Sequence, residues 1–475
     1  MAEQALPPTA EALPARTSSG RGALCVTAGA VALAVLSLGV SLLILGAMLV
    51  TPDALRGIDF RIFYAAGWAL RHGLDPYQGR SLARASVAAI GAGAGQTLGA
   101  FPYLPWVGWI MTPWSLLPYT PALVLWEVLS WSLVLGAARV WARNLGWRRA
   151  WPVAILASVS TTACLGYQVG QFDAMVVALL VATAVAAGRG HWTAAGLASI
   201  AAALLKPQVA LPLAPLLWIF AVRERGSLRS VLAGQAIAVA VLLGGPSILD
   251  PGRTRAWLQL ALHFSHGIGQ GQLALVGLPG LVHLLPASWH PSAGPASLTT
   301  LGLVGAGLAA MVRVVSEPVR AGDTDRARAE RAGGGLLLPL AIWLLVCPYV
   351  HPYDLVVLLP LLILTLGPDG VELRRPLPWV IVSALLLVPV VFPRIPVRGG
   401  TAAPLTSLMV LALVLFAVSR RGGHRRRDAR NLGAPAAMAQ RVEGCSPHSP
   451  ASGGPPPSQP APQRSAVAAN RWPPT

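Results

Sequence analysis

Long apolar runs alternate with short basic segments along most of the chain. The runs lie at residues 23–50, 122–138, 151–168, 172–188, 192–205, 207–222, 231–249, 298–315, 336–348, 355–366, 377–392 and 405–418. A helix needs about 20 apolar residues to cross a bilayer, and most of these runs are near or somewhat below that length. The pattern therefore predicts an all-α polytopic membrane protein, a bundle of about twelve transmembrane helices.

Composition leads to the same class. Of the 475 residues, 54% are hydrophobic and only 11% are charged, which is too little polar residue to cover a soluble globule of this size. The net charge of +18 comes from arginines between the apolar runs and in the tail, as loop bias and anionic headgroups would produce. We expect no nucleic-acid partner. The spacing of the four cysteines matches no metal site, so we expect neither zinc nor a disulfide framework.

The basic segments set the expected orientation. Arg16 and Arg21 precede the first run, which is too long for the core of a signal peptide, so we expect a retained anchor and a cytoplasmic amino terminus. The loop 51–100 is then external. We expect three parts: a disordered cytoplasmic segment 1–22, a membrane domain 23–419, and a disordered, basic, Pro/Ser-rich cytoplasmic tail 420–475.

One apolar stretch does not fit a simple count of spans. Residues 101–118 contain Pro105, Pro113 and Pro118, and counting them as a span would place the arginines of RVWARNLGWRR outside. We therefore interpret 101–118 as a re-entrant or interfacial piece, although a full span stays possible. The preceding run, residues 91–100, is rich in Gly and Ala, and this composition is typical of a movable flap.

The first external loop contains a charged, aromatic-rich stretch, residues 57–78. Its helical spacing places the following residues on one face: Phe60, Phe63, Tyr64, Gly67, Trp68 and Arg71. We expect a short interfacial helix with Arg61 among the lipid headgroups. Asp59 stands at its start, where its carboxylate either caps the first free N–H groups or serves in a reaction.

Unusual polar residues gather at the external ends of the predicted spans. They are Asp59, Gln171, Asp173, Lys206, His351 and Asp354. Ionisable groups at this depth usually face a cavity or a partner. Alternatives stay open: Lys206, the only lysine, either binds an anion or extends to the headgroups, and Gln171 more commonly bonds neighbouring helices than a ligand. Packing does not explain His351, which lies between two prolines, so we favour a site role.

A carboxylate, a lysine and a histidine around a membrane cavity suit sugar transfer from a lipid-linked phosphate donor. The carboxylate would take a proton from an acceptor hydroxyl while cations hold the leaving phosphate. A transporter is the alternative from another class. Transporters commonly show repeat-like halves with matching broken helices, and we find no such symmetry here.

Several motifs resemble the polyprenol-phosphate-mannose-dependent mannosyltransferases, glycosyltransferase family 87, of the multispanning GT-C type. They are GIDFRIFYAAGWALRHGLDPY, FPYLPWVGWIMTPWSLLP, GQFDAMVVALL, AALLKPQ and CPYVHPYDLVVLLPLL, in the family's order, and the resemblance covers roughly residues 30–420. It implies a cell-membrane enzyme that transfers a sugar, usually mannose, on the external face. The implied donor is a polyprenyl phosphate, and no nucleotide sugar is used. A glycolipid, a polysaccharide end and a protein hydroxyl all fit as the acceptor, and we expect no other cofactor and no metal.

The resemblance also implies roles for particular residues. The general base falls on Asp59, and the late histidine of the family falls on His351. We assign binding of the donor phosphate or substrate to Lys206, Gln171, Asp173, Tyr64, Arg61, Tyr103 and Asp354. Asp173 departs from the family, which more often has Asn at this position. No residue excludes another lipid-linked sugar such as arabinose.

Overall fold

A computed structural model describes most of the apolar part of the chain. The described residues are 57–91, 101–148, 150–263, 293–316, 324–347, 349–367 and 406–419, with short pieces within 32–46, at 278 and within 396–401. The expected amino-terminal segment 1–22, the flap residues 92–100, the run 377–392 and the tail 420–475 lie outside them. The predicted division into three parts therefore stays a prediction.

The described residues are almost entirely helical, as the apolar pattern predicted. In chain order the helices are α2 (Ile58–Arg71), α3 (Gly79–Ile90), α4 (Pro105–Met111), η2 (Trp114–Leu116), α5 (Tyr119–Asn144), α6 (Ala150–Ser158), α7 (Thr161–Val169), α8 (Asp173–Gly188), α9 (Trp192–Leu205), α10 (Pro207–Ala210) and α11 (Leu213–Arg223). After them come α12 (Leu228–Val239), η3 (Ala240–Gly244), α13 (Gly245–Leu249), α14 (Pro251–His263), α16 (Ala293–Ser316), α17 (Asp325–Val346), η9 (Pro352–Leu358) and α18 (Leu359–Leu366). An antiparallel pair of two-residue strands, β1 (Pro396–Val397) and β2 (Gly400–Thr401), and a helix Thr406–Ser419 complete the list.

Three of the described helices are long and apolar enough to cross a membrane. They are Tyr119–Asn144, Leu228–Leu249 and Asp325–Val346, and a fourth span is possible if α6 and α7, bent by 49°, count as one. Six shorter apolar helices accompany them, which identifies a polytopic membrane protein. The total of about twelve spans stays a prediction from the apolar runs.

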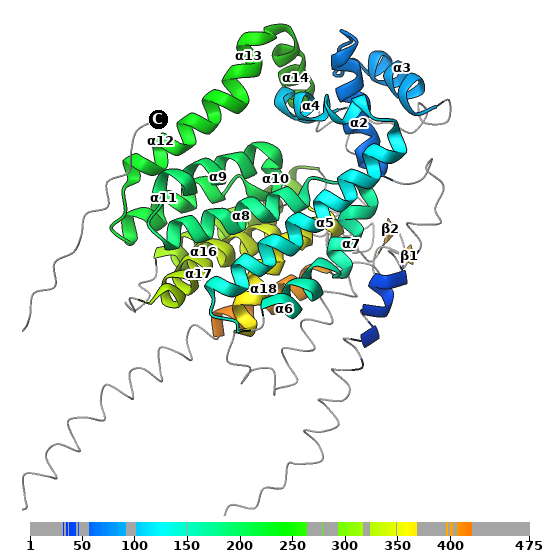
Figure 1. The fold of residues 1–475 in the computed structure, drawn as a ribbon. Helices are drawn as coiled ribbons and strands as arrows, with labels where there is room; N and C mark the ends of the chain where they lie inside the picture. The colour runs from blue at the N-terminus through cyan, green and yellow to red at the C-terminus, as the bar shows by residue number, and fades with distance from the viewer. Residues whose placement is uncertain are drawn as a thin grey trace, which may run out of the picture. The chain divides into compact units, whose positions relative to one another are not determined.

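Helix α8 lies at the centre of the bundle. It packs against α5, α9, α17 and η9, and Figure 1 shows it side by side with α9. Helix α9 in turn packs closely on α12, because Gly196 and Gly234 lack side chains at the crossing. A Cβ at Gly234 would lie 2.0 Å from the carbonyl oxygen of Thr193. Small residues are the usual means of such close approach between membrane helices.

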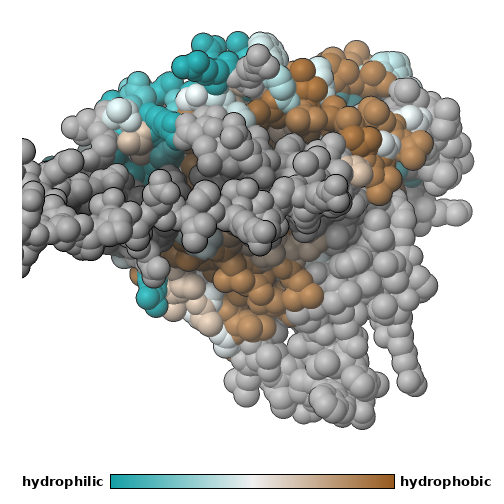
Figure 2. All heavy atoms as spheres, turned by 90° about the horizontal axis from the view of Figure 1, so that it is seen from below, coloured by the Kyte–Doolittle hydropathy of each residue, from teal (hydrophilic) through white to brown (hydrophobic). Residues whose placement is uncertain are grey.

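The surface is apolar in the way expected for contact with lipid. On α5, Trp126 and Trp141 are fully buried, whereas Val124, Leu125 and Val128 are exposed. In water such a stripe would be costly, but lipid tails are as apolar as these side chains. Figure 2 shows apolar residues, in brown, over much of the described surface on one face of the molecule.

The stretch 101–118 forms two short helices instead of one span. Helix α4 and the 3₁₀ turn η2 are separated by Thr112 and Pro113, and neither is among the helices long enough to cross. Both pack against α2. Gly67 permits this contact, since a Cβ there would lie 2.4 Å from the carbonyl oxygen of Met111. The stretch therefore supports α2 from one side.

Candidate functional site

Helix α2 carries Asp59, and its aromatic face is buried in protein. Phe60 and Phe63 have no exposed surface, and their rings contact Trp126 of α5 and Phe172 at centroid distances of 5.6 and 4.4 Å. Arg61 is only 4% exposed, so its expected position among lipid headgroups is wrong. The reason is that α2 is surrounded by α3, α4, η2 and α7, which cover it nearly all round.

Asp59 does not cap its helix. The N-cap residue is Gly57, at φ 60°, and the cap position makes no side-chain hydrogen bond. Instead the Asp59 carboxylate accepts a hydrogen bond of 2.8 Å from the amide of Gln171. The hydroxyl of Tyr103 donates to the other end of the same amide at 3.1 Å. Asp59 is thus held by a chain of polar groups from three separate segments.

A sharp turn between α7 and α8 brings Gln171 to this position. Gly170 has φ +76°, and a Cβ there would lie 2.5 Å from the Cβ of Phe60. The indole N–H of Trp126 donates to the carbonyl of Gly170 at 3.1 Å, and the N–H of Gly57 donates to the carbonyl of Gln168. The sequence Gly-Gln at this junction therefore folds so that the amide of Gln171 meets α2.

A second set of polar residues lies where the ends of α8, α9 and η9 adjoin. The ammonium of Lys206 is paired with Asp173 at 2.7 Å and with Asp354, and Lys206 is only 1% exposed. Its stem therefore does not carry the charge to the surface, as extension to the headgroups would require. The ring of Tyr353 lies 4.9 Å from the same nitrogen. Such burial is tolerated because the ammonium is paired on two sides.

His351 lies next to this cluster, in the connection between α17 and η9. Its backbone N–H donates to the Asp354 carboxylate at 2.6 Å. Its imidazole lies between aromatic rings, at a centroid distance of 5.1 Å from both Tyr349 and Tyr353. Burial lowers the pKa of His351, since it disfavours the imidazolium more than nearby Asp354 favours it. The imidazole is therefore neutral at pH 7, with one ring nitrogen able to accept a proton.

The residues around Asp59 and the residues around Lys206 lie close enough for their charges to interact. Burial raises the pKa of Asp59, and the hydrogen bond from Gln171 and the charges of Lys206 and His351 oppose that rise. Burial also raises the pKa of the Tyr103 hydroxyl, so this group stays a neutral donor. We name the residues Asp59, Tyr103, Gln171, Asp173, Lys206, His351 and Asp354 the polar cluster.

Two residues expected at the site do not join the polar cluster. Arg61 and Tyr64 lie roughly 200° and 140° around α2 from Asp59, given 3.6 residues per turn. The hydroxyl of Tyr64 donates to the carbonyl of Leu117 at 2.8 Å. Their predicted roles in substrate binding stay predictions, with no support from these contacts.

Sequence reasoning missed the two tyrosines beside His351. Tyr349 and Tyr353 alternate with it in YVHPYD, and that alternation of aromatic residues around a histidine was the available signal. Within the described residues, no group of three or more His, Cys, Asp or Glu side chains is arranged to hold a metal ion.

The fold and the polar cluster together define a helical membrane protein with buried ionisable groups at the junctions of its spans. The sequence pattern of glycosyltransferase family 87 matches residues 101–348, just over half of the 475-residue chain. The chain belongs to this family, and it is a membrane glycosyltransferase. It matches no curated protein and no solved structure.

The matched range covers only part of the polar cluster. Tyr103, Gln171, Asp173 and Lys206 lie inside residues 101–348. Asp59 precedes the range, and His351 and Asp354 follow it. Two contacts connect the outlying residues with the matched range. Asp59 contacts Gln171, and Asp354 contacts Lys206.

Proposed function

We propose that this enzyme transfers mannose from a polyprenyl-phosphate donor to a hydroxyl of a glycolipid or glycan on the extracytoplasmic face of the cell membrane. The observation that carries the proposal is the Asp59 carboxylate, which caps nothing and is held at 2.8 Å by Gln171 at a span junction. A carboxylate held beside a buried lysine and a neutral histidine has the means to accept a proton and to stabilise charge.

In the proposed reaction Asp59 takes the proton of the acceptor hydroxyl. The acceptor oxygen forms a bond to the anomeric carbon of the sugar, and the bond from that carbon to the phosphate oxygen breaks. The electron pair of the broken bond leaves with polyprenyl phosphate. Burial raises the pKa of Asp59, and the ionised form of a carboxylate with a raised pKa is a stronger base.

The other members of the polar cluster have supporting roles in this proposal. Gln171 and Tyr103 orient the Asp59 carboxylate through the hydrogen bonds described above. Lys206 is paired with both Asp173 and Asp354, and we propose that it contacts the donor phosphate once one of these carboxylates is protonated or displaced from it. Asp354 fixes the backbone of His351. The reaction uses the lipid-linked sugar as co-substrate and no further cofactor.

Replacement of Asp59 by asparagine tests the proposal. Asp59→Asn keeps a hydrogen-bonding side chain of the same size but cannot accept the proton, so we expect turnover to fall by about 10²–10⁴. Donor binding should be nearly unchanged. Asp75→Asn is the matched control, since Asp75 lies in the same loop and accepts hydrogen bonds from Tyr77 and Gln78.

The measurement is transfer from radiolabelled polyprenyl-phosphate mannose to candidate lipid acceptors by purified protein at matched amounts. A parallel arm with polyprenyl-phosphate arabinose distinguishes the two donor sugars. Near-normal turnover in Asp59→Asn would remove Asp59 as the base. An equal loss in Asp75→Asn would show that the charge of the loop, and not this carboxylate, is required.

A further inference from the structure

A cavity of about 230 Å³ lies at the end of α8 remote from the polar cluster. Helix α8 begins at Asp173 and ends at Gly188, which separates its ends by about 22 Å at 1.5 Å per residue. The cavity is bounded by the loop after α8, the start of α9, the end of α11 and the first turns of α17. It is therefore a different place from the candidate catalytic site.

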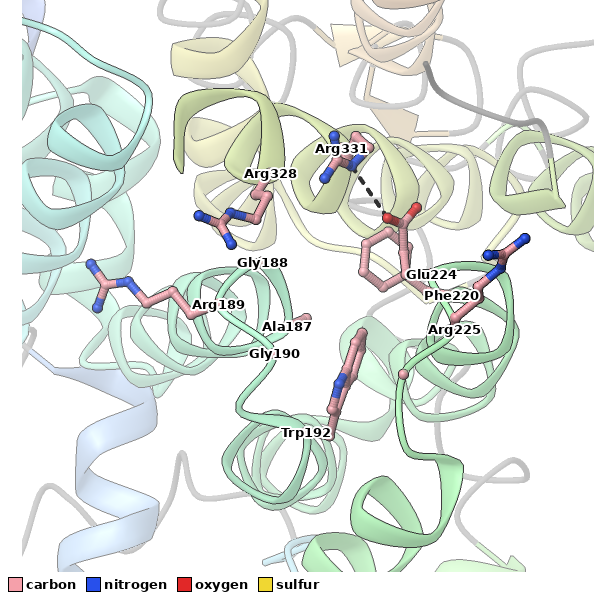
Figure 3. Close-up of a pocket in the computed structure, with 11 residues that line it drawn as sticks. Ala187, Gly188, Arg189, Gly190, Trp192, Phe220, Glu224, Arg225, Arg328 and Arg331 are labelled. Carbon is pink, nitrogen blue, oxygen red and sulfur yellow. Dashed lines mark ion pairs between the residues drawn. The ribbon is translucent and has the colours of Figure 1, made fainter. Parts of the chain in front are cut away.

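Arginines surround this cavity, which we call the arginine pocket. Its lining includes Arg189, Arg225, Arg328 and Arg331, and one carboxylate, that of Glu224. Figure 3 shows Arg189 and Arg328 on one side, Arg225 on the other, and the indole of Trp192 between them. Guanidinium groups on several sides suit an anion with several oxygens, because each can donate to a different oxygen.

The carboxylates near the arginine pocket do not neutralise it. Glu224 pairs with Arg331 at 3.2 Å and with Arg223, outside the lining, at 2.7 Å. Asp325, also outside the lining, pairs with Arg328 at 2.8 Å and is largely exposed. Counting these five arginines and two carboxylates gives a net formal charge of +3.

One arginine of the lining, Arg225, is exposed and has no partner among the described residues. The side chain of Arg225 has neither a hydrogen bond nor an ion pair with any residue that the structure describes, whereas Arg189 donates to Asn144 at 2.9 Å. Arg225 is also the one described non-glycine residue with positive φ, at 54°. This is the position directly after the C-cap of α11, where a left-handed residue commonly ends a helix, and the N–H of Gly226 donates to the carbonyl of Ala221 at 2.7 Å as part of that turn.

Aromatic rings form one side of this pocket. The rings of Trp192 and Phe220 lie 6.2 Å apart at one side of it. The loop passes directly against the indole because Gly226 has no side chain, and a Cβ there would lie 2.2 Å from the ring. Val222, beside the pocket on α11, is 62% exposed, so an apolar surface adjoins the arginines.

We propose that the arginine pocket binds a phosphate group at the end of α8 opposite the polar cluster. The phosphate is that of an anionic lipid headgroup or of a soluble phosphate compound; the chemistry of recognition is the same. A bound phosphate bridges the loop after α8, the end of α11 and the start of α17, and so holds these three segments together. The proposal does not depend on which sugar the enzyme transfers.

The test uses the full-length protein, purified in a neutral detergent and freed of lipid. Thermal unfolding is followed during titration with inorganic phosphate, against sodium chloride at equal ionic strength. A second titration uses mixed micelles of phosphatidylglycerol, against phosphatidylcholine. We expect a saturable rise in the unfolding temperature with phosphate, with phosphatidylglycerol, or with both.

Variants decide whether the pocket is responsible. Arg225→Gln and Arg328→Gln should each weaken the apparent affinity roughly tenfold, as loss of one charge-assisted hydrogen bond predicts. Arg225→Lys keeps the charge and should retain much of the binding even if the glutamine variant folds poorly. Arg143→Gln, an exposed arginine in the last turn of α5 that does not line the pocket, is the control.

The two titrations distinguish the sources of the phosphate. A response to inorganic phosphate that depends on Arg225 and Arg328 supports the proposal with a soluble compound as ligand. A response to phosphatidylglycerol alone, with the same dependence, supports it with a lipid headgroup. No response to either, or an equal loss in Arg143→Gln, overturns the proposal.

Discussion

Asp59 and Lys206 show two different solutions for an ionisable group in a membrane protein. Asp59 is partly buried and accepts one hydrogen bond from an amide, so its pKa depends on burial and on that hydrogen bond. Lys206 is almost fully buried between two carboxylates, so its charge is fixed. The first arrangement suits a group that exchanges a proton, and the second suits a group that holds helices and charges in position.

The raised pKa of Asp59 predicts the acid limb of the pH profile. As a base Asp59 must be ionised, and burial raises its pKa, so kcat/KM should fall with decreasing pH at values above the usual aspartate range. The Gln171 hydrogen bond favours the ionised form, so Gln171→Leu should raise the pKa further and move the limb to higher pH.

The measurement is sugar transfer from pH 4 to pH 9 for wild type, Gln171→Leu and the control Asp75→Asn. The control should keep the wild-type limb. A limb in Gln171→Leu that coincides with the wild-type limb, or lies at lower pH, would contradict the assignment of Asp59 as the titrating group.

Lys206→Met removes the ammonium from between two carboxylates. Breaking a buried pair by removing one partner costs about 3–5 kcal/mol, so we expect a clear fall in the unfolding temperature together with weaker donor binding. Asp173→Asn instead leaves one ammonium and one carboxylate, and asparagine is the residue expected at this position from the family resemblance. Its unfolding temperature should be close to that of wild type or higher.

Unfolding temperature and apparent donor affinity should be measured for both variants in the same detergent. If Lys206→Met unfolds at the same temperature as wild type, the ion pairs contribute little to the stability of the fold, and the lysine has another role. Unchanged donor affinity in a folded Lys206→Met protein would leave Lys206 with a structural role only.

Individual residues could be selected from the sequence, but their pairings could not. Asp173, Lys206 and Asp354 were each recognised because ionisable groups are rare in apolar runs. Their mutual contacts join three segments that are distant in the chain, and spacing alone carries no information about such pairs. For the same reason the partner of Asp59 was not predicted, although both Asp59 and Gln171 were.

At the scale of elements, apolar length predicted most of the helices. The expected runs 172–188 and 192–205 correspond to α8 and α9 within one residue. The run 151–168 was expected as one span but forms α6 and α7, bent by 49°. The bend falls at Val159 and Ser160, in a stretch rich in Ser and Thr, whose side chains compete with helical hydrogen bonds.

The turn between α7 and α8 has a testable role in positioning the site. Gly170→Ala places a methyl group 2.5 Å from the Cβ of Phe60, on a backbone with φ +76° that costs alanine roughly 1–2 kcal/mol. We expect Gln171 to move away from Asp59, so turnover should fall although no ionisable group has changed.

Gly166→Ala is the matched control, since nothing lies within 4 Å of a Cβ there and the residue is helical. Turnover and unfolding temperature should be compared for both. Equal turnover in Gly170→Ala and Gly166→Ala would show that the close approach of this turn to α2 is not needed for activity.

At the scale of the whole molecule, the two ends of α8 have different surroundings. Asp173 begins the helix within the polar cluster, and Gly188 ends it beside the arginine pocket. Arginines near membrane spans collect on the cytoplasmic side. Arg225, Arg328 and Arg331 are among the arginines from which the orientation was predicted, with the polar cluster facing outside, so that orientation stays a prediction.

Thiol labelling of intact cells tests that orientation. In a background whose four native cysteines are replaced by serine or alanine, Gln78→Cys lies in the first loop and Ser227→Cys lies in the loop after α11, and both positions are exposed. We expect an impermeant maleimide to label Gln78→Cys in intact cells and Ser227→Cys only after the membrane is opened, because the arginines around Ser227 keep that loop inside. Both variants should be labelled equally in detergent, which controls for reactivity. Labelling of Ser227→Cys from outside would reverse the orientation and place the polar cluster on the cytoplasmic side.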